Sequence, residues 1–124
     1  MERETTHVLW DREGAYNRLL NDEALLQKMM QMFLDNVEKA MSVLESSRSQ
    51  KDFVSIKAHA HKLKGSASAV GALRVVDDCI AIEEAANATD IERIESEMSL
   101  LKNDISDIQL TMTCFLYTSD AADE

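Results

Sequence analysis

The sequence predicts an all-α protein: an up-and-down antiparallel four-helix bundle with a short extra helix at its N-terminus. The 124 residues include no proline and three glycines, the two residue types that cost most inside a helix. Apolar residues recur at steps of three and four along four long segments, which is the periodicity of amphipathic helices. The breaks between these segments are short, and short connections make consecutive helices antiparallel.

The first two predicted helices follow a polar N-terminal lead-in. Asp11 is the expected N-cap of a short helix over about 12–20, and Asn21 or Asp22 is the expected N-cap of the long helix that follows. The polar segment 46–50 is expected to end that long helix. Its predicted core face consists of Leu26, Met30, Phe33, Val37, Met41 and Leu44.

The other three helices are predicted from the same two signals, caps and apolar spacing. Asp52 caps the third helix, and Gly71 marks the break before a fourth helix over about 72–87. The run Thr89-Asp90-Ile91-Glu92 has the form of a capping box and opens a fifth helix, whose apolar pattern ends near Met112. The expected core residues are Phe53, Ile56, Ala60, Leu63 and Ala67 in the third helix, Leu73, Val76, Ile80 and Ile82 in the fourth, and Ile91, Ile94, Met98, Leu101, Ile105, Ile108 and Met112 in the fifth.

Charge and composition exclude several classes of function. Thirteen basic residues stand against 23 acidic ones, for a net charge of −10, which disfavours binding to nucleic acid or to an anionic membrane surface. No apolar stretch approaches the roughly 18 residues that span a bilayer, and the charged N-terminus has no signal-peptide pattern. Cys79 and Cys114 form neither a metal-binding spacing nor a disulfide framework. We therefore expect a cytoplasmic protein, with any membrane anchor in a longer native chain.

The third helix carries the clearest chemical signal. At about 100° per residue, His61 points away from the core face. The residues on its own face are Lys57, Lys64 and Gly65. His59 lies nearly opposite, so the two histidines cannot bind one metal ion while the helix is intact. Two cations beside an exposed imidazole form a positive island in an acidic chain, and such an island suits a phosphoryl group.

Gly65 admits two interpretations. A glycine inside a helix costs about 0.5–1 kcal/mol relative to alanine. One interpretation is structural, with the glycine at a helix end or at a close helix crossing. The other is functional: the missing side chain gives a large partner access to His61, which stands one turn earlier.

The residues around His61 resemble the signature of a known family. The run His61-Lys62-Leu63-Lys64-Gly65-Ser66-Ala67, followed by Gly71-Ala72, is similar to the His-x-Leu-Lys-Gly-Ser and Gly-Ala pattern of histidine phosphotransfer (HPt) domains. The flanking matches are Asp11-Arg12-Glu13-Gly14-Ala15, Leu19, Asp22-Glu23-Ala24-Leu25-Leu26, Phe33-Leu34 and Cys79-Ile80-Ala81-Ile82-Glu83, where Ile82 replaces the family's leucine. The resemblance covers about residues 10–112, so we assign 1–10 to the lead-in and 11–113 to the HPt domain.

The resemblance implies a phosphocarrier in a phosphorelay. His61 would accept a phosphoryl group from an aspartyl phosphate of one receiver domain and pass it to the aspartate of another. Lys64 would stabilise the phosphoryl oxygens, and the receiver would dock on Lys57, Lys64, Gly65 and Ser68. In such pairs the receiver supplies Mg²⁺, so we expect no cofactor or metal here. We also expect a monomer without ATP binding or autokinase activity, of the type found in hybrid sensor kinases.

Two other functions stay open at this point. A helical module that docks receivers without carrying phosphate is one, although such a module would not need His61. An enzyme that uses His61 as a general base is the other. It is disfavoured because no carboxylate is expected beside the imidazole to orient it, since the residues on its face are lysine and glycine. His59 is the competing phosphoacceptor, disfavoured by its position relative to the motif and by its helix face.

Residues 114–124 differ in character from the rest of the chain. They show no helical periodicity, and they resemble a peptide read from a sequencing-library adapter at every position but Phe115. We interpret them as a tail foreign to the domain and assign them no function; the alternative is an ordinary acidic tail. Cys114 is therefore not interpreted as a redox residue.

Overall fold

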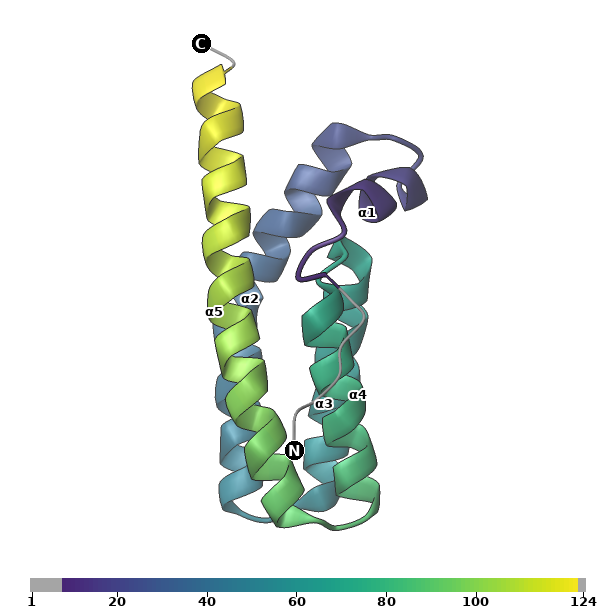
Figure 1. The fold of residues 1–124 in the computed structure, drawn as a ribbon, viewed down its shortest axis with the longest axis vertical. Coiled ribbons are helices and arrows are strands. Elements are labelled where there is room, and N and C mark those ends of the chain that lie inside the picture. Colours follow the sequence, from purple (N-terminus) through teal and green to yellow (C-terminus); the bar gives the residue numbers. More distant parts are fainter. Residues whose placement is uncertain (1–7, 123–124) are drawn as a thin grey trace.

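The chain folds into five helices, as seen in a computed structural model that describes residues 8–122 and the side chains of residues 8–117. The helices are α1 (Arg12–Arg18), α2 (Glu23–Ser49), α3 (Phe53–Val70), α4 (Leu73–Asn87) and α5 (Ile91–Ala122). Helices α2 to α5 run alternately in opposite directions, and α1 lies beside the end where α3 gives way to α4 (Figure 1). The predicted bundle with its short N-terminal helix is confirmed. Residues 1–7 of the predicted lead-in lie outside the described residues.

Aspartate side chains begin four of the helices. Those of Asp11, Asp22 and Asp52 accept hydrogen bonds from backbone N–H groups three residues on, at 3.0, 3.0 and 3.2 Å, as predicted. At α5 the predicted capping box is wrong by one residue, because Asp90 accepts from the backbone N–H three residues on, at 3.1 Å. Thr89 has a positive φ of 49° at the turn after α4. An N-cap residue needs an extended backbone, so the cap falls to Asp90.

The ends of α1 and α2 differ from prediction because backbone turns set them. α1 ends earlier than expected, since Leu20 and Asn21 adopt positive φ angles of 58° and 61°. α2 runs through most of the polar segment 46–50. Polar residues do not break the helix there, because Ser47 packs inward and the chain turns only at Lys51, where φ is 55°.

α5 continues beyond the predicted end near Met112 and reaches Ala122, so most of the tail is helical, contrary to prediction. Phe115 supplies a local reason. Its ring meets Trp10 edge-to-face at a centroid distance of 5.5 Å, and the guanidinium of Arg12 lies 4.9 Å from its centre. α5 consequently extends past the neighbouring helices (Figure 1). That the tail is foreign to the domain stays a prediction.

The core is built by the predicted faces of α2, α3 and α5, where Phe53 and Ile91 are the predicted positions that are only partly buried. α4 differs. Ile82 is buried as predicted, but Ile80 is 40% exposed, because α4 carries apolar residues on more than one face and spacing alone does not select the inner one. Leu73 and Val76 are only partly buried. The buried apolar residues of α4 are Val75, Cys79, Ile82, Ala85 and Ala86.

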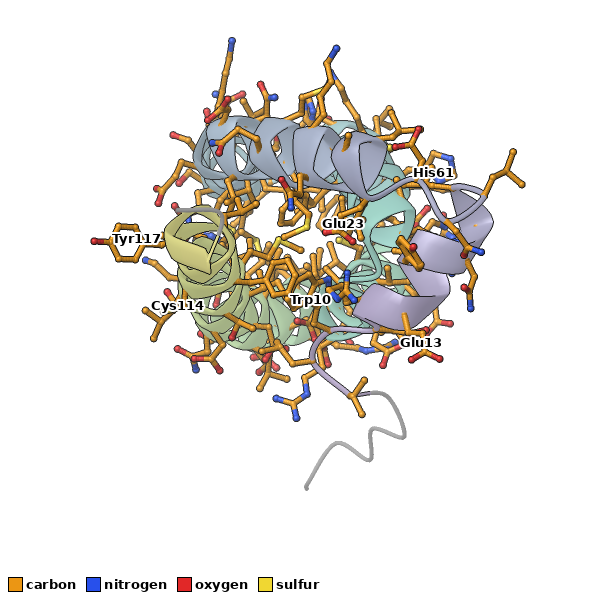
Figure 2. The ribbon with its side chains drawn as sticks, turned by 90° about the horizontal axis from the view of Figure 1, so that it is seen from above. Trp10, Glu13, Glu23, His61, Cys114 and Tyr117 are labelled. Atoms are coloured by element: carbon orange, nitrogen blue, oxygen red, sulfur yellow. The ribbon has the colours of Figure 1, made fainter. Side chains whose placement is uncertain are left out.

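The N-terminal segment closes the C-terminal end of α3. The indole of Trp10, which points into the middle of the bundle (Figure 2), donates to the Val70 carbonyl at 2.9 Å. The Asp11 backbone N–H donates to the Gly71 carbonyl at 2.8 Å. Helix ends leave carbonyls without partners inside the helix, and these bonds satisfy two of them. Gly71 has a φ of 80°, and a Cβ there would collide with the Asp11 carbonyl oxygen, so the fold requires this glycine.

Candidate functional site around His61

His61 is displayed on the outside of α3. Its side chain is 70% exposed, while Ile56, Ala60 and Leu63 of the same helix are buried in the core. Seen from above, the imidazole lies at the edge of the bundle, away from the central side chains (Figure 2). The predicted orientation of His61 is confirmed.

His61 has a carboxylate partner on the neighbouring helix. Its Nδ1 lies 3.1 Å from Oε2 of Glu83, which projects from α4. The same carboxylate pairs with Lys64, whose Nζ lies 2.8 Å from Oε1. The expectation that no carboxylate orients the ring is therefore wrong. A helical wheel shows only neighbours on one helix, and Glu83 reaches His61 across the contact between α3 and α4.

Burial and hydrogen bonding act in opposite directions on Glu83. Its side chain is only 14% exposed, and this burial raises the pKa of the carboxyl group. The contacts with Lys64 and His61 outweigh burial, so the pKa of Glu83 lies below its usual value. Glu83 is thus a carboxylate at neutral pH, and it holds the ammonium group of Lys64 on the α4 side of His61.

The surface next to His61 is open at Gly65. α3 continues to Val70, so Gly65 does not stand at a helix end. A Cβ placed on Gly65 would meet no described atom within 4 Å apart from the nearby backbone of its own helix, so none of the described helices crosses closely there. Both structural interpretations of this glycine are wrong, and the access interpretation is the one left.

The other predicted partner-binding residues line the same face. Lys57 and Ser68 are exposed, at spacings that place them with His61 and Gly65 along one side of α3. The carbonyl of Ser68 accepts a hydrogen bond from the guanidinium of Arg18 at 2.9 Å. Sequence reasoning missed Arg18, because the contact joins residues that are 50 positions apart in the chain.

His59 lies on a different face of α3 and lines a groove. The groove lies between α2 and α3 and has a volume of about 440 Å³, with Met29, Met32 and Phe33 among its walls. His59 is half-buried there, together with the exposed Lys62. The two histidines face apart, as predicted. In the part of the chain that the structure describes, no cluster of three or more His, Cys, Asp or Glu side chains is arranged to hold a metal ion.

The remaining predictions concern the cysteines and the membrane. Cys79 is fully buried in the core, where burial raises the pKa of its thiol and makes it unreactive. Cys114 is exposed on α5. Within residues 8–122, no helix combines the length and apolar character needed to cross a membrane.

An antiparallel four-helix bundle that presents an exposed histidine, with a lysine and a glycine one turn further on, defines the class of histidine phosphotransfer domains. The family model of the Hpt domain matches residues 28–110, and the chain belongs to this family. Histidine phosphotransfer proteins are phosphocarriers and not kinases. The chain accordingly functions in phosphorelay signalling.

Relatives agree with this assignment. The chain is 27% identical over 111 residues to histidine-containing phosphotransfer protein 5 of Arabidopsis thaliana, a match that covers 79% of this chain and 71% of that protein. The solved structure of a maize histidine-containing phosphotransfer protein superposes with a TM-score of 0.82 at 20% identity, covering 92% of this chain and 87% of that one. The HPT domain of a sensor hybrid histidine kinase from Shewanella gives a TM-score of 0.79 at 19% identity, covering 89% and 95%. The two structures are similar to this chain in fold.

Proposed function

We propose that His61 is the phosphoacceptor of this domain. The observation that carries the proposal is its imidazole, which is 70% exposed on a face of α3 that the described residues leave uncovered. The Nε2 lone pair attacks the phosphorus of a receiver's aspartyl phosphate. The N–P bond forms while the P–O bond to the aspartate breaks, and the aspartate leaves as a carboxylate. The reverse sequence passes the phosphoryl group to a second receiver.

The chemistry of the face suits this step. A neutral imidazole is a competent nucleophile near neutral pH, and phosphoryl transfer needs mainly alignment and neutralisation of charge. Lys64 supplies the charge. It stands one turn from His61 with its side chain 29% exposed, and rotation away from Glu83 brings its ammonium group toward the phosphoryl oxygens.

Receiver domains are the proposed partners, and they dock on Lys57, Lys64, Gly65 and Ser68. The lysines attract the phosphorylated surface of the receiver, and Gly65 leaves room for it. The receiver brings its own Mg²⁺, so this domain needs no cofactor and no ATP site. It acts as a monomer in the cytoplasm, either free or as part of a membrane-anchored hybrid kinase.

Transfer from a phosphorylated receiver tests the proposal. The wild type, His61→Gln and His59→Gln are each mixed with a receiver that carries an aspartyl phosphate, and acid-labile, base-stable phosphate on the protein is followed. The wild type and the His59 variant are expected to gain phosphate, and the His61 variant to gain none. Phosphate on His61→Gln would refute the assignment.

Two further outcomes separate the alternatives. A stable complex with receivers but no transfer to the wild type would favour the docking module. Incubation of the protein alone with labelled ATP is expected to give no incorporation, and labelling of His61 under these conditions would contradict the absence of autokinase activity.

A further inference from the structure

The groove between α2 and α3 has no role in the steps described above. Its volume of about 440 Å³ lies within the range of small-ligand pockets in proteins. Phe33, Val37, Leu63 and Val70 line it with apolar surface next to the core, and Met32 lines it with a side chain that is 55% exposed. An apolar group bound there would remove this surface from water, which is favourable, and the flexible methionine can adapt to its shape.

The charge of the groove is opposite to that of the chain as a whole. The sequence has 23 acidic residues and a net charge of −10, yet none of the described carboxylates lines the groove. Lys39 on α2 and Lys62 on α3 line it, together with His59. Both lysines are exposed, and neither forms an ion pair with a described carboxylate. The groove therefore combines apolar walls with two ammonium groups that the described residues do not neutralise.

The ammonium groups and the methionines lie at different levels of the groove. α2 and α3 are antiparallel and joined by a short turn (Figure 1), and Lys39 and Lys62 stand at similar distances from that turn, one on each wall. Met29 and Met32 lie further from the turn on α2, as does Val70 on α3. Ten residues separate Lys39 from Met29, which is about 15 Å along a helix. A ligand that matches this layout has an anionic head and an elongated apolar body.

We propose that this groove binds a medium-chain monocarboxylate, with its head between Lys39 and Lys62 and its chain along Met32 and Met29. A carboxylate has two oxygens, one for each ammonium group, and such charge-assisted hydrogen bonds are the stronger kind. The apolar chain extends away from the lysines and covers the methionines. The inference does not depend on His61 as the phosphoacceptor, because the groove lies on a different face of α3.

The charge of the ligand gives the first test. Octanoate, 1-octanol and octyltrimethylammonium are each titrated into the ¹⁵N-labelled protein below the concentrations at which they form micelles, and the backbone amide shifts are followed. Octanoate is expected to bind saturably and to shift the amides that line the groove. The alcohol is expected to bind about tenfold more weakly, because it lacks the charge that two lysines attract, and the cation more weakly still. No saturable binding of octanoate, or equal binding of the alcohol, would overturn the proposal.

Variants of the two lysines locate the head of the ligand. Lys39→Gln and Lys62→Gln are each expected to weaken octanoate binding by about three- to fivefold, the range of exposed ion pairs. Lys28→Gln is the matched control, because Lys28 is exposed on α2 but does not line the groove, and it is expected to bind octanoate like the wild type. Equal affinities in all three variants and the wild type would contradict the placement of the carboxylate and with it the proposal.

The length of the ligand tests its apolar body. A fully buried methylene is worth about fourfold in affinity. The groove is open to solvent along one side, so we expect about twofold for each methylene from hexanoate through octanoate to decanoate. Met32→Gln is expected to reduce this dependence on length, whereas Lys62→Gln is expected to weaken all three acids by the same factor. Met32 is 55% exposed, so its variant is expected to keep the helical circular dichroism of the wild type. Affinities that do not rise with chain length would overturn the proposal.

The same variants reveal two other occupants of the groove. Sedimentation velocity of the wild type without ligand is expected to show a monomer. A dimer that Met32→Gln dissociates would assign the groove to a second copy of the chain and would refute the proposal. If Met32→Gln and Lys39→Gln slow transfer from a phosphorylated receiver while octanoate fails to bind the wild type, the groove belongs to the receiver, and the proposal is again refuted.

Discussion

Gly65 lies inside α3 and Gly71 lies directly after its last residue, and the structure requires a glycine at the second position but not at the first. Gly71 closes α3 with a φ of 80°, and a side chain there would collide with the carbonyl of Asp11. Gly65 has no positive φ, and a side chain there would point into open space. Packing accounts for the first glycine but not for the second. A glycine inside a helix that the fold does not require is best explained by a partner molecule that docks next to His61.

The largest expected effect is on transfer, at the open glycine. Gly65→Glu places a carboxylate one turn from His61, where it blocks a receiver sterically and repels the phosphoryl group. Transfer is expected to fall by about a hundredfold or more, which corresponds to roughly 3 kcal/mol in the barrier. The free energy of unfolding in urea is expected to stay level or to rise, because glutamate is a better helix former than glycine.

Gly65→Ala is the matched control for this variant. It is expected to raise the free energy of unfolding by about 0.5–1 kcal/mol and to leave transfer close to normal, since a methyl group meets no atom there. Normal transfer by Gly65→Glu, or a large loss of stability in either variant, would contradict the distinction between the two glycines.

The closing glycine is expected to show the opposite pattern. Gly71→Ala forces an L side chain into a left-handed backbone and against the carbonyl of Asp11, so the hydrogen bond between Asp11 and Gly71 is strained or lost. We expect the free energy of unfolding to fall by about 2–3 kcal/mol. The folded fraction is expected to transfer phosphate at the wild-type rate. Thermal and urea unfolding measure the loss, and an unchanged stability would show that the N-terminal segment does not close α3 as described.

The sequence predicts those features that depend on a single helix. The helical period of 3.6 residues is enough to predict the core face of α2 and the outward orientation of His61. The aspartate caps predict where α1, α2 and α3 begin. In α4 the same periodicity selects Ile80, which is 40% exposed, because α4 carries apolar residues on more than one face.

Contacts between helices are the part of the site that the sequence does not predict. Glu83 contacts His61 although the two residues are 22 positions apart in the sequence, and no spacing rule for a single helix predicts such a pair. The extension of α5 has the same origin, because Phe115 contacts Trp10 and Arg12 at the other end of the chain. These three contacts need the relative placement of helices, which periodicity does not supply.

A smaller effect on the free energy of unfolding is expected at the contact between the tail and the N-terminal segment that closes α3. Phe115→Ala removes the edge-to-face contact with Trp10 and is expected to lower the free energy of unfolding by about 1 kcal/mol. Tyr117, which is 77% exposed, is the matched control, and its alanine variant is expected to change stability by a few tenths at most. Removal of residues 114–124 is expected to match Phe115→Ala and to leave transfer intact. Wild-type stability in the shortened protein would show that the tail adds nothing to the domain.

The smallest expected effect on the free energy of unfolding is at Glu83, which connects α4 to the exposed face of α3 through His61 and Lys64. The pKa of Glu83 is lowered in the folded protein, because the contacts with Lys64 and His61 outweigh its burial. A carboxyl group of this kind adds stability above its unfolded pKa, near 4.3 for glutamate, and the contribution is lost as the pH falls through the lower folded value. The wild type is therefore expected to exceed Glu83→Gln by about 0.5–1 kcal/mol near neutral pH, and the gap to close in acid. Urea unfolding of both proteins across the acidic range measures this gap. If this difference in free energy of unfolding stayed constant down to strongly acidic pH, the charge of Glu83 would not be its cause. Glu83 would then stabilise the contact between α3 and α4 by packing alone.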